Sequence, residues 1–131
     1  MARYGGWLGA VFGFVAVALG AFGAHALKAQ LSVEALEWYR TGVQYQFWHA
    51  LGMLALVRAC GAAPVTPGRR AAIIACACFA AGIVLFSGSL YAMALSDPRG
   101  RWLGAVTPVG GLCFLAGWIC AAVALWPSDT R

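Results

Sequence analysis

A tyrosine, a glutamine and a histidine fall within five residues at the front of an otherwise apolar stretch, Thr41–Val57. A helix turns by about 100° per residue, which places Tyr45, Gln46 and His49 on one face and Gln44 well away from it. Such a face could bind a small ligand or a lipid headgroup, relay a proton through His49, or hydrogen-bond to neighbouring helices. Each of these roles needs different residues elsewhere in the chain.

Hydroxyl groups in the other apolar stretches are the natural partners for this face. A polar side chain in hydrocarbon is costly unless it is paired, so we expect the face to point inward. On a helix Ser89 lies opposite Ser87 and Tyr91, so the network must branch or one set must meet lipid headgroups. The candidate cluster, or ligand pocket, comprises Tyr45, Gln46, His49, Ser87, Ser89, Tyr91 and Thr107, with His25 and Gln44 as secondary polar residues.

The same residues argue against cofactor, metal and enzyme chemistry. Two histidines could ligate haem, but His25 ends the first apolar stretch and His49 lies two turns into the second, a mismatch of roughly 10 Å between antiparallel helices. The five cysteines form no C-x-x-C pair, so we expect packing residues rather than disulfides. All four carboxylates lie outside the apolar stretches, which disfavours Ser-His-acid catalysis and proton-coupled transport. We expect no enzyme, no cofactor and no metal.

Composition indicates what kind of protein must position these residues. The chain has 131 residues, 63% hydrophobic and only 10% charged, with a mean hydropathy of +0.80. Soluble domains are about a quarter charged, so most of this surface must face something other than water. Four long stretches carry no charge, namely Tyr4–Leu27, Thr41–Val57, Ala71–Ser96 and Trp102–Ser128. Three reach the roughly 20 residues that span a bilayer, and the second does so only if its polar front end also enters.

These stretches predict a single all-α integral membrane domain over residues 1–131, a four-helix transmembrane bundle. The helices are expected at about 5–26, 42–58, 70–95 and 108–126, with a short amphipathic helix at the membrane surface over about 32–41. Ser32 would cap that segment, with Glu34 in its first turn, and the segment could continue unbroken into the second helix. A loop is expected over 60–68 and a turn over 96–100.

The start of the last helix has two interpretations. Thr107-Pro108 resembles an N-cap followed by proline at the first helical position. The alternative is a helix that begins near Arg101 and is kinked at Pro108.

Small residues recur in the first helix at alternating spacings of three and four. In lipid no hydrophobic force drives helices together, so close approach through small residues is a main source of association. We expect this helix to be central and tightly packed, and to be retained although Arg3 and Ala24-His25-Ala26 imitate a secretory signal peptide. The expected packing positions in the chain are Gly6, Gly9, Gly13, Ala16, Gly20, Gly23, Gly82, Gly110 and Gly117.

The formal net charge of +5, from nine Lys and Arg against four Asp and Glu, collects at the ends of the apolar stretches. This placement indicates anchors at the membrane interface and excludes a nucleic-acid surface, which needs basic residues clustered on a solvated face. With four spans, one side carries five cations and the other carries four. The two sets are Arg3, Arg58, Arg69, Arg70 and Arg131, and Lys28, Arg40, Arg99 and Arg101. The positive-inside rule then weakly favours cytoplasmic N- and C-termini.

Four blocks of sequence resemble the signature motifs of one family: GAFGAHALK (Gly20–Lys28), TGVQYQFWHALG (Thr41–Gly52), LFSGSLYAMAL (Leu85–Leu95) and TPVGGLCFLAGW (Thr107–Trp118). The chain is thereby identified as a member of the YgdD-like group of small bacterial inner-membrane proteins (domain of unknown function 423), which has small animal relatives. The match covers nearly the whole chain, in order. The resemblance implies a multi-pass protein of the cytoplasmic membrane with four helices, and it implies no reaction, because the family has no established activity.

These observations predict a non-enzymatic structural or accessory membrane protein that acts through helix packing. Its expected partners are membrane lipids, and it would act within a homo-oligomer or a larger membrane complex. The alternative is a module that binds or transports a small molecule, lipid or ion through the cluster around His49. In the first case the polar residues fix the register of the helices, and in the second they face a ligand.

Overall fold

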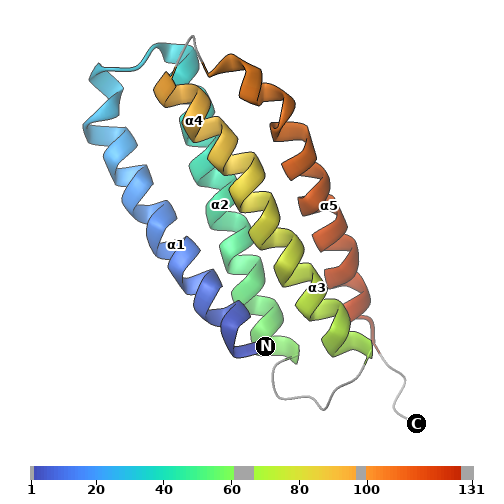
Figure 1. The fold of residues 1–131 in the computed structure, drawn as a ribbon. Coiled ribbons are helices and arrows are strands. Elements are labelled where there is room, and N and C mark those ends of the chain that lie inside the picture. The colour runs from blue at the N-terminus through green and yellow to red at the C-terminus, as the bar shows by residue number, and fades with distance from the viewer. Residues whose placement is uncertain (1, 61–66, 97–99, 128–131) are drawn as a thin grey trace.

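Long helical segments lie side by side in the structure, a computed structural model that describes residues 2–60, 67–96 and 100–127 (Figure 1). They are α1 (Ala2–His25), α2 (Val33–Cys60), α3 (Pro67–Gly82) with η2 (Ile83–Ser87) and α4 (Gly88–Ser96), and η3 (Arg101–Ala105) with α5 (Thr107–Ala124). A short 3-10 turn, η1 (Leu27–Ala29), follows α1. The described residues form no strand, so the predicted all-α class is confirmed.

Within the described residues, three segments are long and apolar enough to cross a membrane: Tyr4–His25, Pro67–Ser96 and Arg101–Ala124. Their outward faces are apolar, as contact with lipid requires. Phe14 of α1 is 77% exposed and Ile119 of α5 is 68% exposed. α2 is not among the three, because Gln44, Gln46 and His49 interrupt its apolar residues. The chain is therefore an all-α membrane protein, and its described residues contain three candidate spans.

α2 is one unbroken helix of 28 residues. The backbone N–H of Ala35 donates to Ser32 Oγ at 3.1 Å, and Glu34 lies in the first turn, so the predicted cap is confirmed. The separate amphipathic helix over 32–41 is wrong, because the helix continues through Arg40 without a breaking residue. The alternative expectation, that this segment runs on into the second helix, is confirmed.

The third segment begins earlier than predicted, at Pro67, because proline is tolerated in the first turn, where an N–H has no intrahelical partner. The predicted loop over 60–68 is therefore wrong at both ends, since Cys60 belongs to α2 and Pro67 and Gly68 belong to α3. Residues 61–66 of that loop, residues 97–99 of the predicted turn, and Arg131 lie outside the described residues. At about 1.5 Å per residue the 30-residue segment exceeds the bilayer core, so it must tilt in a membrane.

The last segment matches neither of its two interpretations in full. It is helical from Arg101, first as the 3-10 turn η3 and then as α5 from Thr107. The predicted Thr107 cap is wrong: Thr107 is the first residue of α5, and no side-chain cap bond precedes it. Because η3 already supplies a helical turn, the N–H groups at the start of α5 reach carbonyls such as that of Val106, and a side-chain cap is not needed.

The small-residue face of α1 lies against α2. A Cβ built on Gly9 would meet the Ala50 carbonyl oxygen at 3.1 Å, and one on Gly23 would meet the Tyr39 ring at 2.6 Å. The remaining positions of this face are looser: Gly6 and Gly20 face Val57 and Val43, Gly13 faces only Ala50, and Ala16 is buried. The expectation that α1 is central is wrong, because α1 lies at one edge of the row and α5 at the other (Figure 1).

Glycines bring the third segment and α5 even closer together. A Cβ on Gly117 would meet the Phe79 ring at 2.6 Å, and a Cβ on Gly82 would overlap the Phe114 ring. A Cβ on Gly110 would overlap the backbone of Phe86, with its Cα at 2.7 Å. A ring can rotate away from such an overlap, whereas a helix backbone cannot, so Gly110 is the least replaceable of the three.

This geometry predicts that Gly110→Ala will destabilise the protein by about 1–3 kcal/mol, because α5 must move away from η2. The matched control is Gly111→Ala, whose Cβ would meet nothing closer than the Phe86 ring at 3.9 Å. Alanine favours a helix over glycine by up to about 1 kcal/mol, so the control should be neutral or slightly stabilising. Melting temperatures in mild detergent measure both, and equal values for the two variants would contradict the packing described.

Candidate functional site: polar contacts between the helices

Gln46 joins three helices through both ends of its amide. Its Nε2 donates to the backbone carbonyl of Phe12 in α1 at 2.9 Å, and its Oε1 accepts from the Tyr91 hydroxyl in α4 at 2.9 Å. The side chain is only 3% exposed. Since each bond reaches a different helix, Gln46 fixes the register of α2 against α1 and α4 together.

Tyr39 makes a second polar contact, about two helical turns closer to the start of α2. Its hydroxyl donates to the carbonyl oxygen of Leu19 in α1 at 2.9 Å, and its ring packs against that of Tyr91 with centroids 5.2 Å apart. The side chain is 2% exposed. Tyr39 and Gln46 therefore bind α1 to α2 at two positions along the helix axes.

His49 pairs with α5 rather than with the hydroxyl residues. The indole Nε1 of Trp118 donates to His49 Nε2 at 3.1 Å, and His49 Nδ1 lies 2.7 Å from the backbone carbonyl of Tyr45. Because an indole N–H can only donate, Nε2 must accept and Nδ1 must carry the proton. The imidazole also stacks on the Phe114 ring, with centroids 3.6 Å apart and planes 11° apart.

Ser89 and Thr107 form a separate pair between α4 and α5. Their hydroxyl oxygens are 2.8 Å apart, Ser89 Oγ is also 2.9 Å from the Phe86 carbonyl, and Thr107 Oγ1 is 3.5 Å from the Leu103 carbonyl. Each hydroxyl has one proton and can accept as well, so both groups are satisfied within the pair and the carbonyls. This pair makes no recorded hydrogen bond to His49 or Gln46, so the candidate cluster is divided into separate contacts, one of the two arrangements that the opposite faces of Ser87 and Ser89 allow.

Ser87 and Tyr45 complete the predicted set in different ways. Ser87 is fully buried at the end of η2, and its Oγ has no hydrogen-bond partner among the described residues. Tyr45 is partly buried; its ring packs on Phe86 with centroids 4.6 Å apart, and its carbonyl serves His49. Neither side chain contacts Gln46 or His49 through a hydrogen bond that the structure records.

The two secondary residues lie outside these contacts. His25 ends α1 and is exposed, and Gln44 is exposed on α2, on the side away from Gln46. Both ring nitrogens of His49 are hydrogen-bonded, which leaves no lone pair for iron, so the donor set does not suit a haem.

Sequence reasoning missed Trp118, Tyr39 and the backbone acceptors Phe12 and Leu19. A tryptophan inside an apolar stretch carries an N–H that needs a partner, and this was the available signal for Trp118. The backbone carbonyls carry no sequence signal. They become acceptors because the glycines of α1 let side chains of α2 approach its backbone.

The arrangement as a whole contains hydrogen bonds that begin and end inside the protein. Gln46, His49, Ser89, Thr107 and Tyr91 each bond another side chain or a backbone carbonyl. Such contacts hold helices together, and they leave little capacity for a bound molecule.

Comparisons with known proteins agree with this picture of a membrane protein. A family model described as a protein of unknown function (DUF423) matches residues 19–111. The chain is 46% identical to the UPF0382 inner membrane protein YgdD of Escherichia coli (strain K12), over 83% of this chain and 79% of that protein. It is 42% identical to the UPF0382 membrane protein YwdK of Bacillus subtilis (strain 168), over 89% and 91%. No solved structure matches the chain.

A third relative, the UPF0382 membrane protein of Haemophilus influenzae, is 40% identical over 92% of each chain. The matches extend over most of both partners in every case, and the family model covers well over half of the chain. The resemblance first seen in the sequence is confirmed: the chain belongs to the DUF423 family of UPF0382 membrane proteins.

Proposed function

We propose that this chain is a non-enzymatic structural or accessory protein of the bacterial cytoplasmic membrane, built as a four-helix transmembrane bundle. The observation that carries the proposal is the closed set of polar contacts between the helices. Gln46 and His49, the most polar side chains in the middle of α2, use their hydrogen-bonding atoms on α1, α4, α5 and their own backbone. Side chains committed in this way stabilise a packing surface and are poorly suited to substrate turnover.

The fourth span in this proposal is α2. It lies between α1 and the third segment along their length, so it must share their depth if they cross the bilayer (Figure 1). Its uncharged stretch, 41–57, is flanked by Arg40 and Arg58, which suit the two interfaces. The cost of taking Gln46 and His49 into hydrocarbon falls because both are paired.

Four spans put the start of α1 and the end of α5 on one side, as their positions at the same end of the molecule support (Figure 1). That end also carries Arg58, Arg69 and Arg70, whereas Lys28, Arg40 and Arg101 lie at the other. Counting the sequence positions Arg3, Arg131 and Arg99 as well gives the small excess that favours cytoplasmic termini. The names of relatives such as YgdD support the inner membrane as the location.

Ser87 favours the alternative, a binding or transport module. Its buried Oγ is unpaired within the described residues, and it ends a π turn, a feature often found at functional sites. A ligand there would have to approach Ser87 between α2 and α4, where Gly42 already contacts the Tyr91 ring. We therefore place this function second.

Topology tests the fourth span directly. Fusions of green fluorescent protein and of alkaline phosphatase to each end of the full chain should report both ends in the cytoplasm, with fluorescence and without phosphatase activity. An odd number of spans puts the two ends on opposite sides. Opposite results for the N- and C-terminal fusions would therefore refute the four-span bundle.

Stability tests the structural role of the polar contacts. Gln46→Ala with His49→Ala should lower the free energy of unfolding by roughly 1–3 kcal/mol, since interhelical hydrogen bonds in membranes contribute about 0.6–2 kcal/mol each. Gln44→Ala, an exposed neighbour on the same helix, is the matched control and should unfold like the wild type. Thermal unfolding in mild detergent gives the three values.

The same preparations separate the two candidate functions. Native mass spectrometry should find no small molecule or ion that binds the wild type stoichiometrically and is lost from the double variant. Finding one would overturn the structural role and favour the binding module, whatever the melting temperatures show.

A further inference from the structure

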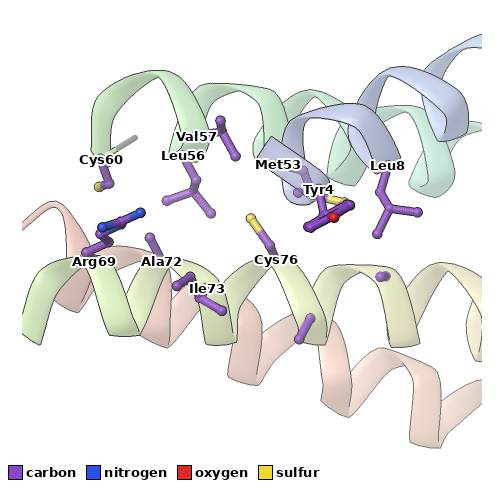
Figure 2. Close-up of a pocket in the computed structure, with 13 residues that line it drawn as sticks. Tyr4, Leu8, Met53, Leu56, Val57, Cys60, Arg69, Ala72, Ile73 and Cys76 are labelled. Atoms are coloured by element: carbon purple, nitrogen blue, oxygen red, sulfur yellow. The ribbon is translucent and has the colours of Figure 1, made fainter. Parts of the chain in front are cut away.

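An apolar groove lies at the end of the molecule where α1 begins and α2 ends, away from the polar contacts of Gln46 and His49. It has a volume of about 220 Å³ and is bounded by α1, α2 and α3. Leu8, Val57, Ile73 and Cys76 line it from these three helices, and Figure 2 shows Leu8 and Cys76 pointing into the space between them. Drug-sized ligand pockets are usually about 300–1,000 Å³, so this space suits a narrower, flexible chain.

The groove runs along the helices rather than across them. Its lining positions on α3 begin at Arg69, recur every three or four residues and end at Ala80, which makes a continuous stripe of about 16 Å. Met53 and Cys60 mark a parallel stripe on α2. Because the helices cross the membrane along this direction, the long axis of the groove is the direction of a lipid acyl chain.

One end of the groove carries a cation. The Arg69 side chain lies between α2 and α3, opposite Cys60, beyond the apolar part of the lining (Figure 2). Arg69 falls in the first turn of the candidate span Pro67–Ser96, which is the depth of the headgroup region. A guanidinium binds a phosphate group through two parallel N–H···O bonds.

Charge at this end of the molecule is of one sign within the described residues. Arg58 and Arg70 lie nearby, whereas the carboxylates of the described chain, Glu34 and Glu37, lie in the first turns of α2 at the opposite end. The groove therefore combines an acyl-chain channel with a positive end, and both features match one kind of molecule.

We propose that this groove binds one anionic phospholipid, with an acyl chain between α1, α2 and α3 and the phosphate on Arg69. The chain's membrane location supplies the lipid, and the site is independent of the polar contacts and of the accessory role proposed above. Loss of this site would leave the stability and topology results unchanged, so the two proposals can fail separately.

Native mass spectrometry of the full chain in mild detergent tests the site, with phosphatidylglycerol and phosphatidylcholine of identical acyl chains as probes. The wild type should retain one phosphatidylglycerol and hold it more tightly than phosphatidylcholine. Arg69→Gln should weaken phosphatidylglycerol binding roughly tenfold, the size expected for a lost bond between charged groups. Arg70→Gln removes the same charge from the next residue, which does not line the groove, and should bind like the wild type.

A second pair of variants tests the acyl channel. Ala77→Phe places a ring in the groove and should reduce retention of both lipids, whereas Ala116→Phe, on the exposed face of α5 and away from the groove, should not. Equal loss in Arg69→Gln and Arg70→Gln would show surface charge only. Equal effects of the two phenylalanines, or a bound fatty acid in place of the phospholipid, would also overturn the proposal.

A measurement on the wild type covers the case in which a variant fails to fold. Phosphatidylglycerol with a photoreactive group in its acyl chain should cross-link to groove residues such as Leu8, Leu56 and Ile73. Labelling spread evenly over the exposed face of α5, for example at Leu115 and Ile119, would indicate annular lipid and refute a specific site.

Discussion

Aromatic rings seated on glycines set the distance between these helices, and the other contacts depend on that distance. Gly23 of α1 accepts the Tyr39 ring, Gly42 of α2 accepts Tyr91, and Gly82 and Gly117 accept Phe114 and Phe79. A Cβ at any of these positions would come within 2.8 Å of a ring atom. In lipid, where apolar burial gives no driving force, this close van der Waals fit is what association relies on.

The polar contacts depend on the positions of the same aromatic rings. The Tyr91 hydroxyl reaches Gln46 because the Tyr91 ring lies on Gly42, and the Tyr39 hydroxyl reaches the α1 backbone because its ring lies on Gly23. His49 stacks on Phe114, which covers Gly82. Packing and hydrogen bonding are therefore one system. The apolar groove lies outside it, where α1, α2 and α3 border a space that the described side chains leave open.

Much of this fold could be predicted from the sequence. Uncharged stretches predict the helices, and helical period separates Gln46 from Gln44, which the structure places in buried and exposed positions. The residues that hydrogen-bond to one another across the helices could not be predicted in the same way. The helical period of the sequence suggested the serines of the third segment as partners for His49. The pairing with Trp118 depends on how α2 and α5 are aligned along their length, which is set by the rings that pack on glycines. The Thr107 cap failed for a related reason, since a local motif cannot reveal that a 3-10 turn precedes it.

The π turn η2 divides the third segment between two neighbours. Before it, α3 packs mainly on α5, and after it α4 packs mainly on α2. A π turn holds one residue more than an α turn, and each added residue rotates the remainder of the helix by about 100°. The π turn Ile83–Ser87 therefore rotates α4 relative to α3, so that one continuous helical segment can present one face to α5 and another to α2. The length of this stretch therefore matters as much as its residues: deleting one residue there would rotate α4 and misalign its contacts without changing any residue that makes one.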